Sequence, residues 1–92
     1  MDKGFHITVT GRVQGVGYRF HCRDAARKLK LRGYVMNLTD GNVEIKVYGD
    51  STKLQQFIKD ITRTDRFFKV IDMNINDLEN DVSVGEFEIR FY

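Results

Sequence analysis

Apolar residues recur along the chain with two different periods, and these periods predict its secondary structure. Around residues 5–10 apolar and polar side chains alternate, as in a β-strand that buries one face. From 18 to 31 the apolar residues recur every three or four positions, as on the buried side of an amphipathic helix. Applied to the whole chain, the two periods predict two helices, 18–31 and 51–63, and five strands, 5–10, 34–38, 43–48, 67–75 and 87–91.

Residues with special backbone preferences predict where these elements end. Gly33 is expected to close the first helix in a left-handed conformation, and Asp40-Gly41 to form a tight hairpin turn. Asp50 or Ser51 is expected to cap the second helix. In the segment 67–75 the apolar positions change phase, which predicts either a β-bulge or a strand that is covered on both faces.

The order of these elements is β-α-β-β-α-β, with a short extra strand at the C-terminal end. This order predicts an α+β protein of the ferredoxin-like class, a two-layer sandwich in which two helices cover one face of an antiparallel sheet. The length of the chain, 92 residues, predicts a single domain, 1–92. The fold class leaves the function open, because it includes enzymes, RNA-binding domains and regulatory modules.

Composition narrows the class of protein further. Hydrophobic residues make up 41% and charged residues 30% of the chain, which is typical of globular proteins. The longest apolar run, 34–36, is too short to span a membrane, and the first residues lack the apolar core of a signal peptide. The single cysteine, Cys22, excludes an internal disulfide and favours a reducing cytoplasm. The sequence has no broad apolar stripe that would form an interface between copies, so we expect a monomer.

Basic residues are concentrated between 12 and 32, although the net charge is only +2. That net charge is too small to predict nucleic-acid binding, but the local cluster favours small anions. The cluster includes the segment GRVQGVGYR, residues 11–19, in which Gly11, Gly15 and Gly17 permit positive φ values. A glycine-rich segment of this kind lets the backbone approach a ligand closely.

The start of the first helix adds a positive field to this segment. It directs free N–H groups and the positive end of the helix dipole at the glycines, and Arg19 offers a planar fork of donors that fits two phosphate oxygens. The segment lacks both Gly-Lys-Ser/Thr and a third glycine after Gly17, so it suits a small anion and not a nucleotide. A plain glycine-rich turn with a surface arginine explains the same residues equally well.

Asn37 is the other informative polar residue. It lies near the end of the second strand, and the predicted fold can bring it beside the start of the first helix. Its amide can donate to and accept from one water molecule. The alternative is a strand-end residue that bonds only to its own turn.

The remaining reactive residues give little support to other chemistry. His6, His21 and Cys22 do not have the spacing of zinc ligands, and the acidic residues within 76–85 lack the pattern of a calcium loop. Cys22 lies on the apolar side of the first helix, where a thiol is inert. The residues predict neither a metal site nor a covalent mechanism.

Two segments resemble the signatures of the acylphosphatase family. Residues 11–19 are similar to its phosphate-loop signature almost letter for letter, and residues 31–37 and 40–44 resemble its second signature, a strand, hairpin and strand. The resemblance covers the whole chain in length and in element order. It implies an enzyme that hydrolyses the carboxyl–phosphate bond of acyl phosphates, without a metal or other cofactor, to give a carboxylate and inorganic phosphate.

The resemblance also implies roles for particular residues. Arg19 corresponds to the arginine that grips the phosphoryl group, and Asn37 to the asparagine that orients the attacking water. The phosphate cradle is completed by backbone amides of the loop, those of Gly15, Val16, Gly17, Tyr18 and Arg19. The expected partner is a small acyl phosphate, with phosphate as a product and competitive inhibitor and with no nucleic acid or membrane involved.

Four positions depart from the family pattern. Tyr18 replaces a phenylalanine, Tyr34 a frequent tryptophan, Met36 a frequent basic residue, and Thr64-Asp65 a common Gly-Pro. Met36 is expected to weaken the attraction for anionic substrates, and Tyr34 to loosen the packing beside the site. These departures bear on substrate preference and loop geometry more than on the reaction.

Two functions without catalysis compete with the enzyme. An RNA-binding module of this topology needs aromatic residues on the two central strands, but the positions expected to be exposed there include one aromatic: His6, Thr8, Thr10, Glu44, Lys46 and Tyr48. The second alternative is a domain that senses phosphate or carboxylate by binding it at the loop without turnover.

Overall fold

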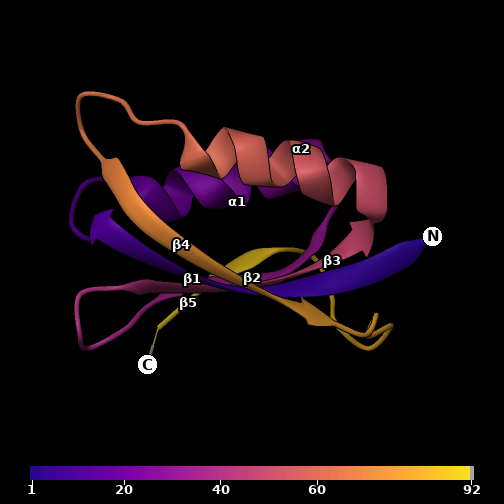
Figure 1. Ribbon diagram of the computed structural model, residues 1–92. Helices are drawn as coiled ribbons and strands as arrows, with labels where there is room; N and C mark the ends of the chain where they lie inside the picture. Colours follow the sequence, from indigo (N-terminus) through magenta and orange to yellow (C-terminus); the bar gives the residue numbers. More distant parts are fainter. Residues whose placement is uncertain (92) are drawn as a thin grey trace.

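The computed structural model describes residues 1–91, which form one sheet with two helices on the same face (Figure 1). Within this part of the chain, neither helix combines the length and the apolar character needed to cross a membrane. The sheet has the strand order β4-β1-β3-β2-β5. The elements are β1 (Asp2–Arg12), α1 (Tyr18–Lys28), β2 (Arg32–Asn37), β3 (Val43–Asp50), α2 (Ser51–Thr62), β4 (Lys69–Leu78) and β5 (Glu88–Arg90).

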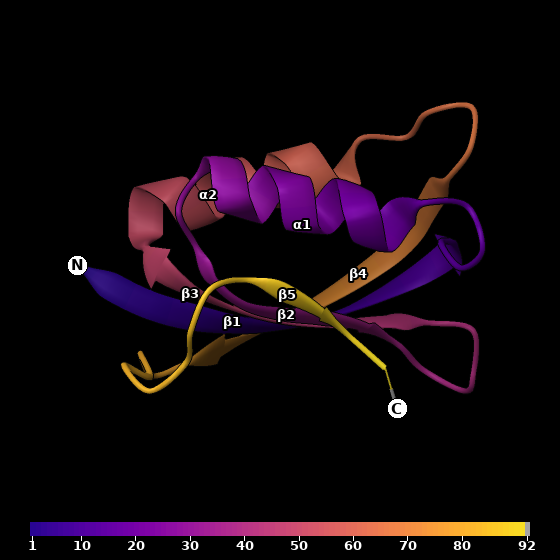
Figure 2. The ribbon, with the colours of Figure 1, turned by 180° about the vertical axis from the view of Figure 1, so that it is seen from behind.

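The predicted α+β, ferredoxin-like sandwich is confirmed, with one correction to the sheet. Strands β1 to β4 pair antiparallel, but β5 pairs parallel with β2, so the sheet is mixed and not purely antiparallel. The pairings make β4 and β2 run in opposite directions. A chain that turns back after β4 and joins the far edge therefore lies parallel to β2, as Figure 2 shows for the yellow β5.

The core lies between the sheet and the helices. Apolar residues of α1 and α2 that recur at helical spacing are buried against the apolar residues that alternate along the central strands. Burial of each large apolar side chain stabilises the fold by about 1.5–3 kcal/mol. The largest fully buried side chains of the core include Tyr18, Phe57, Phe87, Ile7, Ile45, Leu54 and Ile61.

The end of α1 differs from the prediction. The helix ends at Lys28, and Lys30, with φ 57°, takes the left-handed position expected of Gly33. Gly33 instead lies inside β2, opposite Val47, where a Cβ would collide with the carbonyl oxygen of Lys46. The glycine is therefore needed for close strand pairing and not for helix termination.

The beginning of α2 is capped by Asp50. Its Oδ1 accepts hydrogen bonds from the backbone N–H groups of Thr52 at 2.9 Å and Lys53 at 3.3 Å. These bonds satisfy two of the N–H groups that a helix start leaves free, and they lower the pKa of Asp50. Of the two predicted caps, Asp50 and Ser51, the structure selects the first.

The predicted bulge lies in β4 beside the end of β1. Thr10 pairs with Asp72 and Gly11 with Val70, so Ile71 is the extra residue, and its side chain is exposed. This explains the phase change in the segment 67–75. β1 also continues to Arg12, beyond its predicted end at residue 10. The loop that leads into α1 is consequently short, covering residues 13–17.

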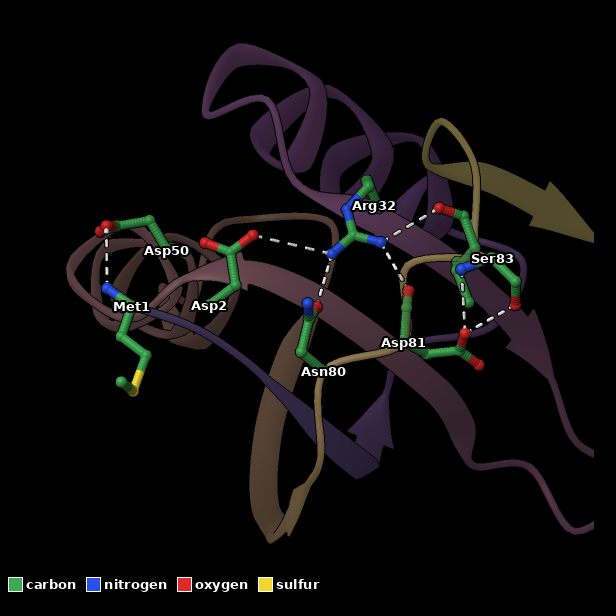
Figure 3. Close-up of polar contacts among 8 residues, drawn as sticks. Met1, Asp2, Arg32, Asp50, Asn80, Asp81 and Ser83 are labelled. Atoms are coloured by element: carbon green, nitrogen blue, oxygen red, sulfur yellow. Dashed lines mark hydrogen bonds and ion pairs between the residues drawn. The ribbon is translucent and has the colours of Figure 1, made fainter.

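Arg32 holds the segment between β4 and β5 against the sheet (Figure 3). Its Nη1 donates to the carbonyl oxygens of Asp81 at 2.6 Å and Val84 at 3.2 Å, and its Nη2 donates to Asn80 Oδ1 at 2.6 Å. The connection thus passes over the beginning of β2, which carries Arg32. This anchoring sets the path on which β5 reaches the edge of β2.

The uncovered face of the sheet is polar. Glu44 accepts a hydrogen bond of 2.6 Å from the Tyr34 hydroxyl, and its other oxygen lies 3.2 Å from His6 Nε2. Tyr48, which we expected to be exposed, is buried because its ring packs over Gly4. The two tyrosines of this face are thus engaged with neighbouring residues, and they do not form an open platform for stacking bases.

Candidate active site

The loop between β1 and α1 has the backbone conformation of an anion cradle. Gly15 and Gly17 have φ values of 71° and 83°, in the left-handed region that favours glycine. Gly17 is also the N-cap of α1, and no side chain among residues 1–91 caps this helix. N–H groups of the first turn are therefore available to a ligand, together with the positive end of the helix dipole. The loop borders a pocket of about 270 Å³ lined by Val13, Gly15, Gly17, Tyr18, Arg19 and Phe20.

The side chain of Tyr18 anchors this loop from beneath. It is buried, its hydroxyl donates a 2.8 Å hydrogen bond to the carbonyl oxygen of Ile61, and its ring meets Phe68 edge to face. Burial raises the pKa of Tyr18 far above its usual range. Tyr18 can therefore offer its backbone amide to a ligand, while its hydroxyl ties the start of α1 to the end of α2.

Arg19 and Asn37 line a second pocket, of about 180 Å³, together with Arg90 and Phe91. Arg19 comes from the first turn of α1, and Asn37 is the last residue of β2. Arg19 also lines the loop pocket, so this one side chain borders both. The two residues that we singled out in distant parts of the sequence therefore share one pocket.

The guanidinium of Arg19 is available to an anion. Among residues 1–91 it makes no hydrogen bond or ion pair, although its Cζ lies 5.3 Å from the centre of the Phe91 ring. Stacking on an aromatic face orients a guanidinium and leaves the N–H groups at its edge free. The geometry is that of a donor fork held in place for bidentate contact.

The amide of Asn37 contains a buried polar atom without a partner. Oδ1 of Asn37 is shielded from solvent and accepts no hydrogen bond from residues 1–91. The turn after it is closed by other groups, since Leu38 N–H donates to the Asn42 carbonyl and Asn42 N–H to Asp40 Oδ1, both at 2.9 Å. The idea that Asn37 only serves its own turn therefore finds no support. A buried acceptor left without a bond costs about 1–3 kcal/mol of folding free energy.

Gln14 joins the two halves of the site. Its Nε2 donates to the carbonyl oxygens of Leu38 and Asn42, each at 2.7 Å, and so connects the glycine loop to the β2–β3 turn beside Asn37. The sequence alone does not single out this residue, because its bonds depend on how the turn folds back over the loop. Gln14 thus fixes the position of Asn37 relative to Arg19 without lining either pocket.

Replacing Gln14 with alanine is expected to lower kcat/KM for a reaction at this site about tenfold. The two carbonyl groups keep their backbone donors but lose the bond to Gln14. The glycine loop and the turn are then no longer tied together, and they move apart by amounts that matter for reacting groups. We also expect unfolding to become easier by about 1–2 kcal/mol. Steady-state kinetics and urea unfolding measure both effects. Gln55→Ala, at an exposed position of α2, is the matched control and should change neither.

Other reactive groups lie away from these pockets. Cys22 is fully buried, and burial raises its pKa to about 12, which makes the thiol unreactive at neutral pH. His21 Nε2 lies 2.8 Å from the carbonyl oxygen of Asp60, and its ring packs against Phe68. Within residues 1–91, no three side chains of His, Cys, Asp or Glu are grouped so that they could hold a metal ion.

Comparison with known proteins gives a consistent result. The model of the family described as Acylphosphatase matches residues 5–89. The chain is 35% identical to the acylphosphatase of Bacillus pumilus, over 94% of this chain and 96% of the relative, and 43% identical to that of Clostridium perfringens, over 90% and 89%. The crystal structure of acylphosphatase from Bacillus subtilis superimposes with a TM-score of 0.91 at 37% identity and covers 98% of this chain and 99% of that one.

Proposed function

Because the chain belongs to the acylphosphatase family and is therefore a hydrolase of acyl phosphates, we propose that Arg19 and Asn37 are the residues that carry the reaction. The reaction splits the carboxyl–phosphate bond and gives a carboxylate and inorganic phosphate. The observation that carries the assignment is the shared pocket, which is lined both by Arg19, with its free guanidinium, and by Asn37, whose buried amide oxygen has no partner among residues 1–91.

The phosphoryl group occupies the loop pocket in this proposal. The amides of Gly15, Val16, Gly17, Tyr18 and Arg19 surround its oxygens, and the N-terminus of α1 adds a positive field. The Arg19 guanidinium binds two of the oxygens from the side that faces the second pocket. The charge that spreads over the phosphoryl oxygens in the transition state thus meets donors that are already in position.

Asn37 holds the attacking water. Its side-chain amide, which has a donor and an acceptor end, bonds to the water and turns a lone pair of the water oxygen towards phosphorus. The new bond forms between the water oxygen and phosphorus, while the bond from phosphorus to the bridging oxygen breaks and its electron pair leaves with the carboxylate. One water proton passes to a phosphoryl oxygen. Since a carboxylate is a good leaving group, positioning and charge stabilisation supply most of the catalysis.

We extend the proposal to the setting of the reaction. The chain acts as one domain and as a monomer, in the cytoplasm, without a metal, a nucleic acid or a membrane. A chain whose single cysteine, Cys22, is buried suits a reducing compartment, and the polar, uncovered sheet face supports a monomer. Inorganic phosphate is a product of the reaction and fits the same cradle, so it competes with the substrate.

Hydrolysis of benzoyl phosphate in the presence of EDTA tests the proposal. We expect turnover that the chelator does not change, and competitive inhibition by inorganic phosphate. Phosphate binding without turnover would instead identify a sensing domain. Activity that disappears with EDTA and returns with a divalent cation would contradict the metal-independent mechanism.

A further inference from the structure

The proposed reaction restricts where the acyl group of the substrate can lie. In an in-line displacement the attacking and the leaving oxygen are on opposite sides of phosphorus. Asn37, which holds the attacking water, lines one pocket with Arg19, Arg90 and Phe91. Among residues 1–91 this pocket shares only Arg19 with the loop pocket that receives the phosphoryl group. The acyl group therefore lies on the far side of the loop pocket, away from Asn37.

Asn37 and the loop pocket reach the phosphoryl group from different layers of the fold. Asn37 is the last residue of β2, and the turn that follows it extends from the sheet (Figure 1). Phe20 lies in the first turn of α1, in the helix layer at the same end of the molecule. Phe20 lines the loop pocket but not the pocket of Asn37. It is thus placed on the side to which a leaving group departs.

Phe20 is also the apolar surface that the loop pocket offers to a ligand. The other two large apolar residues that line this pocket, Val13 and Tyr18, are each 1% exposed, whereas Phe20 is 53% exposed. The Cζ atom of Arg23 lies 5.0 Å from the centre of the Phe20 ring, which covers one face of the ring. The rest of the ring is available to the carbon atoms of a substrate.

We propose that Phe20 binds the acyl group, and that the enzyme therefore prefers acyl phosphates with an extended apolar acyl group. The inference rests on the proposed function, since it requires the phosphoryl group in the loop and the attacking water at Asn37. The bond from phosphorus to the bridging oxygen points towards Phe20, and its electron pair leaves with the carboxylate on that side. Methylene groups that pack against the ring are removed from water, which stabilises the bound substrate. An acetyl group offers only one methyl group for this contact.

A matched pair of substrates tests the proposal. Acetyl phosphate and hexanoyl phosphate release carboxylates of nearly equal basicity and differ in four methylene groups. We expect the native enzyme to have about tenfold higher kcat/KM for hexanoyl phosphate. In Phe20→Ala this ratio should fall towards one, mainly through a higher KM for hexanoyl phosphate, because the lost contact is one of substrate binding. Phe20→Leu keeps an apolar side chain and should retain part of the ratio.

Two other phenylalanines provide the controls. Phe67 is 58% exposed, and the Cζ atom of Arg66 lies 5.8 Å from the centre of its ring, so its surroundings match those of Phe20. It lines neither pocket of the site, and Phe67→Ala should leave the ratio unchanged. Phe91 lines the pocket of Asn37, so Phe91→Ala tests the opposite placement of the acyl group. It should affect both substrates alike.

The possible outcomes separate this inference from the function on which it rests. Normal turnover of both compounds without a preference for hexanoyl phosphate overturns the role of Phe20 and leaves the hydrolase intact. An equal loss for both substrates in Phe20→Ala also overturns it, because the residue is then structural. A ratio that falls in Phe91→Ala and persists in Phe20→Ala would place the acyl group on the side of Asn37. If the native protein hydrolyses neither compound, the proposed site fails together with the inference.

Discussion

Replacing Arg19 with alanine is expected to lower kcat/KM for benzoyl phosphate by about a thousandfold or more. An arginine that stabilises a transferring phosphoryl group contributes about 10³–10⁵ in rate in other enzymes. Here Arg19 borders both pockets, and among residues 1–91 it makes no ion pair that would compete with the substrate. Initial rates over a range of substrate concentration measure the effect, and phosphate binding by calorimetry should weaken in parallel.

The controls for Arg19 lie on the same helix. Arg23, one turn later, pairs with Asp24 and stacks on Phe20 but lines neither pocket, so Arg23→Ala should keep near-native activity. Arg19→Lys keeps the charge and loses the planar fork, and we expect it to recover only a small part of the lost activity. Full activity in Arg19→Ala would show that the phosphoryl group is bound elsewhere.

The fold could be predicted from sequence because its signals are local. Alternation and helical spacing are properties of neighbouring residues, and they located both helices and all five strands within a few positions. The errors arose where a distant segment decides the backbone. Gly33 looks like a helix cap when only its neighbours are considered, but the carbonyl of Lys46 on β3 is what requires a glycine there.

The residues of the site also differ in whether the sequence alone can predict their roles. The glycine loop and Arg19 form one continuous segment, so their chemistry can be recognised in the sequence. The role of Gln14 depends on hydrogen bonds to residues 24 and 28 positions away in the sequence. No local pattern encodes those contacts. Asn37 lies between these cases, because its residue type suggested a function but only the fold places it beside Arg19.

Glycine has different physical roles at different positions of this chain. At Gly11 and Gly33 a Cβ would collide with the backbone of a neighbouring strand, whereas at Gly15 and Gly17 the surrounding space is open. The two loop glycines are therefore required by their positive φ values alone. Open space above them is also what a phosphoryl group needs in order to approach the amides of the loop.

Replacing Asn37 with alanine is expected to lower kcat about a hundredfold or more, with a small change in KM. The variant keeps the phosphate cradle and Arg19, so substrate binding persists, but the attacking water is no longer oriented. Single-turnover measurements should place the loss in the chemical step, and the inhibition constant of phosphate should remain close to the native value. Asn74→Ala, at an exposed position of β4, is the matched control and should leave kcat unchanged.

Stability provides a second measurement on the same variant. Since Asn37 Oδ1 has no partner among residues 1–91, its removal deletes an unsatisfied buried acceptor and no protein hydrogen bond to that atom. We therefore expect the free energy of unfolding of Asn37→Ala to be unchanged or higher, by up to about 1 kcal/mol, while activity falls. A loss of activity that follows a loss of stability would instead make Asn37 a structural residue. If activity falls while the free energy of unfolding rises, Asn37 is retained for the reaction although it lowers the stability of the fold.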